Sequence, residues 1–137
     1  MAHVYDSFRN YLAVGSVNLS SVTLKAALVN TLANVASGYV FSAAHTTLAN
    51  VPAVAIQATG TLANVAVSSG RVNADDIAIA DVEGGDINAI IVYVSTANSS
   101  TSPLAFIQSD GTGFPTTPDG GTINVIWANS DPFILKV

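Results

Sequence analysis

The chain has 137 residues, of which 50% are hydrophobic and only 9% are charged. This length and apolar content fit a single domain over residues 1–137 with one core, and they exclude intrinsic disorder. The net charge is −5 and the four basic residues stand apart in the sequence, which excludes the clustered Lys and Arg of nucleic-acid binding.

Residues 4–14 are predicted to form the one clear helix. Val4, Phe8 and Leu12 recur at helical spacing and form an apolar stripe, which Tyr11 widens. Gly15 stands where a helix C-cap belongs. The segment is short and has one basic residue, so we expect it to cover the core and not to bind a membrane.

From residue 22 onward the hydrophobic period changes to two, which predicts short strands. Residues 22–29 alternate, with Lys25 on a partly wet face. Residues 87–96 are almost entirely apolar, which predicts a central strand that is covered on both faces. Further strands are predicted at residues 38–41, 53–58, 62–67, 70–73, 77–82, 103–108, 122–128 and 133–137.

Turn signals every eight to fifteen residues and the lack of a second long helix predict a mainly β fold. We expect an antiparallel β-sandwich or small barrel with one short N-terminal helix. The pentapeptide TLANV occurs at residues 31–35, 47–51 and 61–65, but the flanking residues do not match. Coincidence is therefore preferred over a duplicated strand–turn unit.

The low charge indicates a surface that is buried against partners. About 25% of residues are charged in an ordinary soluble domain, so Ser, Thr, Asn and Ala must cover most of this one. Charge depletion is typical of interface cores, although a neutral surface without partners also fits. The longest apolar run, near residues 87–94, is too short to span a bilayer. Residues 1–10 lack the apolar run of a signal peptide, so we expect synthesis in the cytosol and no membrane association.

Residues that carry chemistry are few. The chain has no cysteine, and its two histidines are His3, in a terminus expected to fray, and His45, in a predicted loop. No G-x-S-x-G nucleophile motif and no Gly-rich phosphate loop is present. The sequence therefore predicts no catalytic residues, no cofactor-binding residues and no enzymatic activity.

Acidic residues gather in one segment, at Asp75, Asp76, Asp81, Glu83 and Asp86. The two ends of a strand at 77–82 are about 20 Å apart, so they cannot share one cation unless the chain folds back. Residues 81–86 alone are a candidate for a weak cation site, and a solvated turn is the preferred alternative. We predict no metal.

The Gly- and Pro-rich segment 110–121 is predicted to be a loop. Phe114 lies between Gly113 and Pro115 and is expected to contact a partner, with a buried loop anchor as an equal alternative. The complete set of predicted partner contacts, from this loop and the N-terminal helix, is Phe114, Pro115, Pro118, Tyr5 and Phe8.

Four segments carry a resemblance to a known family: VYDSFRNYLAVGSVNLSSVTLKAALV at 4–29, VNADDIAIADVEGGDINAIIVYV at 72–94, SPLAFIQSDGTGFPTTPDGG at 102–121 and INVIWANSDPFILKV at 123–137. The order of NADD, an apolar strand, SPL, PxxPxGG and a Trp strand resembles small virion structural proteins of tailed bacteriophages. Residues 30–71 contribute less to this resemblance.

The resemblance implies a virion protein that is made in the host cytoplasm and has no catalytic residues. A capsid decoration (cement) protein that binds the major capsid protein is the leading expectation, with a symmetric homo-oligomer or symmetric placement. A neck, tail or fibre component that binds other virion proteins is the alternative. A receptor- or carbohydrate-binding module is a further alternative, which needs an exposed aromatic platform such as Phe114 with Tyr39.

Overall fold

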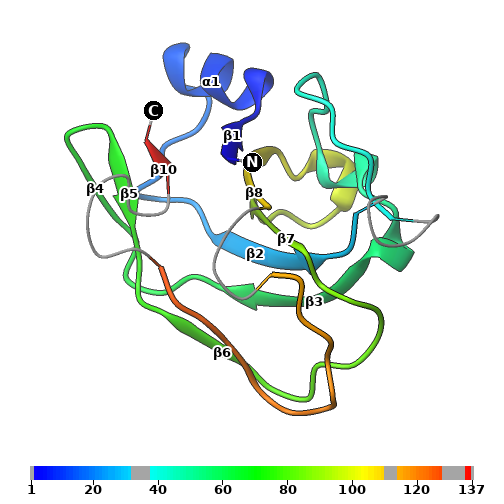
Figure 1. The fold of residues 1–137 in the computed structure, drawn as a ribbon. Helices are drawn as coiled ribbons and strands as arrows, with labels where there is room; N and C mark the ends of the chain where they lie inside the picture. Colours follow the sequence, from blue (N-terminus) through cyan, green and yellow to red (C-terminus); the bar gives the residue numbers. More distant parts are fainter. Residues whose placement is uncertain (1, 32–37, 110–113, 128–134, 137) are drawn as a thin grey trace.

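Residues 2–31, 38–109, 114–127 and 135–136 are those that the computed structural model describes (Figure 1). The predicted mainly β fold, with antiparallel sheets and one short helix near the N-terminus, is confirmed. The helix α1 spans Asp6–Ala13, and Gly15 follows it with φ +77°, as the predicted cap requires. Three short 3₁₀ helices are η1 (Leu48–Asn50), η2 (Ala53–Ala55) and η3 (Ser99–Thr101).

A five-stranded antiparallel sheet forms the centre of the fold, in the order β1-β8-β7-β2-β3. The strands are β1 (Ala2–Val4), β2 (Leu24–Val29), β3 (Ile56–Thr61), β7 (Ala89–Val94) and β8 (Leu104–Gln108). The predicted central strand is β7, which pairs with β8 on one side and β2 on the other. Residues on both of its faces are buried, as its apolar run predicts.

Two smaller sheets flank this centre. One has the order β10-β5-β4, from β4 (Ala66–Ser68), β5 (Arg71–Asn73) and β10 (Leu135–Lys136). The other is a two-stranded ribbon of β6 (Ile77–Ile79) and β9 (Ile123–Val125). In Figure 1 the ribbon lies below the five-stranded sheet, while α1 lies above it.

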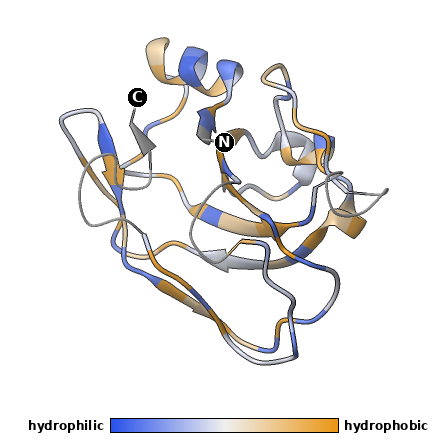
Figure 2. Ribbon diagram, viewed as in Figure 1, coloured by the Kyte–Doolittle hydropathy of each residue, from blue (hydrophilic) through white to orange (hydrophobic). Residues whose placement is uncertain are grey.

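The ribbon packs on the sheet through a small core cluster of Leu28, Ile79, Val82, Ile87 and Val125. Hydrophobic residues along β6 and β9 supply its lower side (Figure 2). Gly60 in β3 permits the close approach, because a Cβ there would lie 3.0 Å from Cδ1 of Ile79. A larger cluster joins the sheet to α1 and to the segment that contains Tyr39, Val51 and Ala55.

Several local predictions were wrong. Residues 38–41 do not form a strand, and only an isolated bridge joins Tyr39 to Thr31. The predicted strand at 53–58 begins as the 3₁₀ helix η2, and β3 continues beyond it to Thr61. Lys25 in β2 is partly exposed, as predicted, but the rest of its face is buried, because core clusters pack against β2.

The N-terminus is also more ordered than expected. His3 belongs to β1, which pairs with β8 opposite Ile107, so it does not fray. Val4 lies in this strand and not in the helix. Tyr5 then turns the chain from β1 into α1, with its N–H donating to the Ala105 carbonyl at 3.0 Å.

The described TLANV copies adopt different structures. Residues 47–51 contain η1, at whose N-terminus the Thr47 N–H donates to Oδ1 of Asn50 at 3.2 Å. Residues 61–65 leave the end of β3 and turn at Asn64, which has φ +53°. The copy at 31–35 lies largely outside the described residues. The same five letters therefore do not encode a repeated structural unit in the two copies described.

Candidate interaction surfaces

Two of the predicted partner contacts lie inside the core. Tyr5 and Phe8 are both 0% exposed and belong to the larger core cluster. The expectation that they contact a partner is corrected here, because the fold uses the apolar side of α1 and the turn before it to cover the sheet. Pro115 in the predicted contact loop is exposed, and Phe114 and Pro118 are half-buried. Phe114 packs against the smaller core cluster, so it anchors the loop.

Hydrogen bonds hold the predicted contact loop, at residues 114–121, against the turn at residues 81–87. Ile87 and Thr116 exchange two backbone hydrogen bonds of 2.8 Å. Gly120 N–H donates to the Val82 carbonyl at 2.8 Å. The Thr117 hydroxyl donates to Oδ1 of Asp86 at 2.7 Å. We name residues 81–87 with 114–121 the acidic loop pair, because four carboxylates lie on it.

Those four carboxylates are Asp81, Glu83, Asp86 and Asp119, of which only Asp86 is half-buried. Asp86 accepts the Thr117 bond, and Asp119 Oδ1 accepts the N–H of Gly121 at 2.9 Å. In the part of the chain that the structure describes, no three His, Cys, Asp or Glu side chains come together as a metal-binding group.

The other two acidic residues of this segment brace the turn between β5 and β6. Asp75 Oδ2 accepts a 2.6 Å hydrogen bond from the Asn64 amide. Asp76 Oδ1 accepts the backbone N–H of Trp127 at 2.8 Å. The indole N–H of Trp127 donates to the Asp75 carbonyl at 3.1 Å. Trp127 itself is half-buried and packs against both core clusters.

A second surface feature is an open apolar groove of about 410 Å³ between α1 and the β4–β5 hairpin. Its lining is Leu12, Gly15, Val17, Asn18, Leu19, Ser20 and Val67. Val14 stands beside it with 66% of its surface exposed, and Val67 is 43% exposed. Large exposed apolar side chains are common at contact surfaces when they cluster.

Charged residues of both signs lie near the groove, because the exposed Asp6 precedes Arg9 by one turn on α1. Arg9 is exposed and precedes Leu12 by three residues on α1, so both lie on neighbouring parts of the helix surface. Arg71 in β5 pairs opposite Ser68, the residue after Val67. Lys136 in β10 pairs opposite Arg71. No acidic residue lines the groove.

Charge is segregated along the sequence. Every acidic residue except Asp6 falls between residues 72 and 135, and that stretch contains no Lys or Arg. In Figure 1 the acidic loop pair lies at the lower right, whereas α1 and the β4–β5 hairpin lie at the top and upper left. Sequence reasoning treated the bases as isolated and missed this pattern, which the order of charges alone contains.

A buried polar network ties the N-terminus to the 38–45 segment. The hydroxyls of Tyr5 and Tyr39 are 2.9 Å apart, and the Tyr39 hydroxyl lies 2.7 Å from Nδ1 of His45. Burial raises the pKa of both tyrosines above the ordinary value. His45 lies in a loop, as predicted, and there it is half-buried and bonded to Tyr39.

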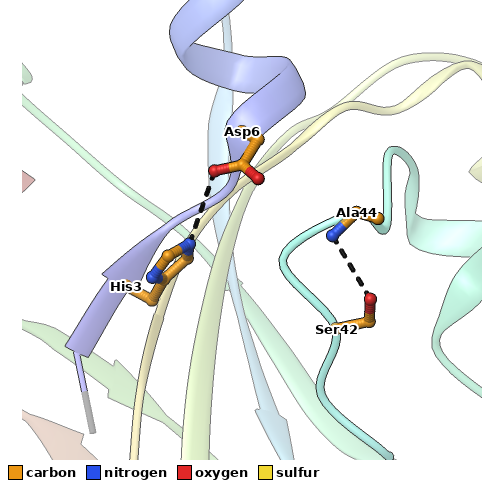
Figure 3. A network of polar contacts seen from close by, with 4 residues as sticks. All are labelled: His3, Asp6, Ser42 and Ala44. Atoms are coloured by element: carbon orange, nitrogen blue, oxygen red, sulfur yellow. Dashed lines mark hydrogen bonds and ion pairs between the residues drawn. The ribbon is translucent and has the colours of Figure 1, made fainter.

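His3 lies at the edge of the same region. Its ring packs against Phe41 with centroids 5.3 Å apart, and Nε2 faces the Asp6 carboxylate at 3.7 Å (Figure 3). Close by, the Ala44 N–H donates to the Ser42 hydroxyl at 3.3 Å (Figure 3). These contacts position the turn into α1.

Among the described residues, no helix is long and apolar enough to cross a membrane. No protein-family model matches the chain, and no curated protein sequence matches it either.

Proposed function

We propose that this chain is a structural protein of a tailed-phage virion, which decorates the assembled capsid by packing against the major capsid protein. In this role the chain works by binding and not by catalysis. Part of the support is the resemblance of residues 4–29, 72–94, 102–121 and 123–137 to small virion proteins of tailed phages.

The observation that carries the proposal is the character of the surface. Only 9% of the residues are charged, and large apolar side chains stand exposed at several places. They are Val14 (66%), Val40 (56%), Val54 (70%), Val67 (43%) and Ile126 (76%). A surface of this kind gains free energy when a partner covers it, because apolar area leaves water without desolvating many charges. A protein at the seams between shell subunits gains from such contacts at each seam.

The test is the copy number of the chain in purified particles of the source virus, measured by quantitative mass spectrometry against the major capsid protein. Decoration predicts a fixed ratio of the same order as the shell protein. A small fraction of that ratio would instead assign the chain to a neck, tail or fibre. Complete absence from the particles would overturn a virion role.

The carbohydrate-binding alternative loses the platform that it required. Tyr39 is 1% exposed and its hydroxyl is used by Tyr5 and His45, so it does not form an exposed aromatic surface with Phe114. Flat exposed aromatic rings are what make stacking surfaces for ligands. The capsid proposal needs no such platform.

A further inference from the structure

We propose that residues 38–45 form a proton-sensitive latch. While His45 is neutral, its bond to Tyr39 holds this segment against the turn before α1, and protonation of His45 releases the segment. The inference rests on hydrogen bonds among buried groups and does not depend on the virion role.

The latch consists of three side chains bonded in a row, which we name the hydroxyl series: Tyr5, Tyr39 and His45. The two hydroxyls lie 2.9 Å apart, and that of Tyr39 lies 2.7 Å from Nδ1 of His45. Tyr5 is 0% exposed and Tyr39 is 1% exposed, so water does not replace either bond. Among the described residues, the Tyr5 hydroxyl bonds to Tyr39 alone. Both hydroxyl protons therefore need acceptors within the series.

The number of protons fixes the direction of the bonds while His45 is neutral. A hydroxyl donates one hydrogen bond, and a neutral imidazole has one nitrogen that accepts. When Tyr39 donates to Nδ1 of His45 and Tyr5 donates to Tyr39, both buried protons have acceptors. The opposite direction leaves the Tyr5 proton in the core without an acceptor, which is costly. Neutral His45 therefore carries its own proton on Nε2.

Protonation of His45 removes the acceptor at the end of the hydroxyl series. An imidazolium has a proton on both nitrogens, so Nδ1 then donates and no longer accepts. The Tyr39 oxygen receives this new proton, and one of the two tyrosine protons is left without an acceptor. The series is therefore complete at high pH and is broken as the pH falls through the range in which histidine gains its charge, about pH 8 to 5.

No ion pair in the described part of the chain offsets the new charge on His45. The Asp6 carboxylate of α1 faces Nε2 of His3 in β1, at 3.7 Å. Tyr5 and Tyr39 keep their protons throughout this range, because burial raises the pKa of both. His45 is therefore the member of the hydroxyl series that changes charge between pH 8 and 5.

The other contacts between the segment and this turn are weaker. The Asp6 N–H donates to the Ala43 carbonyl at 3.3 Å, which is long for such a bond. The Phe41 ring packs beside the Tyr5 ring, with centroids 5.8 Å apart. Loss of the hydroxyl series therefore loosens the segment at this turn and uncovers the Tyr5 ring.

Amide hydrogen exchange, followed by NMR between pH 8 and 5.5, tests the latch as protection factors corrected for the intrinsic rate at each pH. The reporters are the N–H groups of Asp6 and His45, which donate to the carbonyls of Ala43 and Ser42. The reference is the Asn88 N–H, which donates to Val29 in the five-stranded sheet. We expect the protection of the reporters to fall about tenfold on acidification, and that of the reference to change less than about twofold.

Three variants assign the effect to His45. His45→Gln keeps an acceptor for the Tyr39 proton but does not titrate, so its reporters should stay protected at every pH. His3→Gln is the matched control at the other histidine and should keep the wild-type response. Tyr39→Phe breaks the hydroxyl series at every pH, so its reporters should be weakly protected already at pH 8.

The ¹⁵N chemical shifts of the His45 ring at pH 8 check the direction of the bonds, and we expect Nδ1 to carry no proton. A proton on Nδ1 at pH 8, a wild-type chain without the pH response, or an equal response in H45Q would each overturn the proposal. A response that is lost in H3Q and kept in H45Q would assign the effect to His3 and would overturn it as well. These results do not bear on the copy number in virions.

Discussion

The hydroxyl oxygen of Tyr5 lies 2.9 Å from that of Tyr39, and neither residue is more than 1% exposed. Tyr39 is the middle member of the network, because its hydroxyl also reaches His45. The two rings come from segments on either side of β2 in the sequence. Their hydrogen bond therefore joins the turn before α1 to the 38–45 segment.

Removal of the Tyr39 hydroxyl should cost more stability than removal of the Tyr5 hydroxyl. Tyr39→Phe leaves the fully buried Tyr5 hydroxyl without this partner, at a cost of about 1–3 kcal/mol. Tyr5→Phe leaves Tyr39 bonded to His45 and should cost about 1 kcal/mol. Urea denaturation of both variants and of Y5F/Y39F measures the order. Equal losses in the two single variants would show that the Tyr39 hydroxyl does not bond to both Tyr5 and His45.

Stability should fall at high pH. Burial raises the pKa of Tyr5 and of Tyr39 above the ordinary value of 10.0, so the folded chain holds these two protons more tightly than the unfolded chain. Their contribution is fully present below pH 10 and decreases above it, where the unfolded state ionises first. The loss approaches about 1.4 kcal/mol per pH unit for a tyrosine that is ionised in the unfolded state and still protonated in the folded state.

Denaturation midpoints at pH 8, 9, 10 and 11 measure this slope, and Tyr5→Phe is the control. The variant should have a shallower slope above pH 10 than the wild type. A slope that is the same in both proteins would mean that Tyr5 does not contribute to it.

Trp127 should contribute to stability through its ring more than through its indole N–H. Trp127→Phe removes the 3.1 Å hydrogen bond to the Asp75 carbonyl and should cost about 1 kcal/mol. Trp127→Ala also removes contacts with both core clusters and should cost about 2–4 kcal/mol, less than for a fully buried ring. The matched control is Ile126→Ala, whose side chain is 76% exposed and should change stability by less than about 0.5 kcal/mol. Thermal denaturation followed by circular dichroism ranks the three variants, and equal melting temperatures for W127A and I126A would contradict the packing described.

Gly60→Ala should destabilise the fold by about 1–3 kcal/mol, because the added methyl group meets Ile79 at 3.0 Å. Adding Ile79→Val removes Cδ1, one of the two Ile79 atoms that it meets at 3.0 Å, so the double variant should lose less than the sum of the two single losses. Gly15→Ala is the comparison at an open site, where only the backbone φ of +77° carries a cost. Additive losses in G60A/I79V, measured by denaturant titration, would mean that β6 does not press on β3 at this point.

The strands that could be predicted from the sequence are those whose burial shows in their own residues. The run in β7 is nearly all apolar, and the structure buries it on both faces. Residues 38–41 are also mostly apolar and were predicted to form a strand. Tyr39 is buried and Val40 is exposed, yet no ladder forms there. A strand forms only where it can pair with the edge of another strand. The edge strands of the five-stranded sheet are β1 and β3, and residues 38–41 pair with neither of them. Such pairing depends on distant residues and is absent from the local pattern.

The contact residues were only partly predictable for a related reason. An apolar side chain on a short helix indicates burial, but the sequence does not say whether the cover is the chain's own core or a partner. For Tyr5 and Phe8 the cover is the core, whereas Pro115 remains exposed. The groove beside Leu12 could not be predicted, because Val67 reaches it from a hairpin far away in sequence.

The strand order has a consequence for the chain as it leaves the ribosome. The hairpin of β7 and β8 lies between β1 and β2, so the first two strands cannot join one sheet until about residue 108 has emerged. At roughly 5–20 residues per second, β2 waits for several seconds with one edge unpaired. During that interval its Ala- and Leu-rich segment is available to chaperones or to aggregation, and the late arrival of β7 sets the pace of folding.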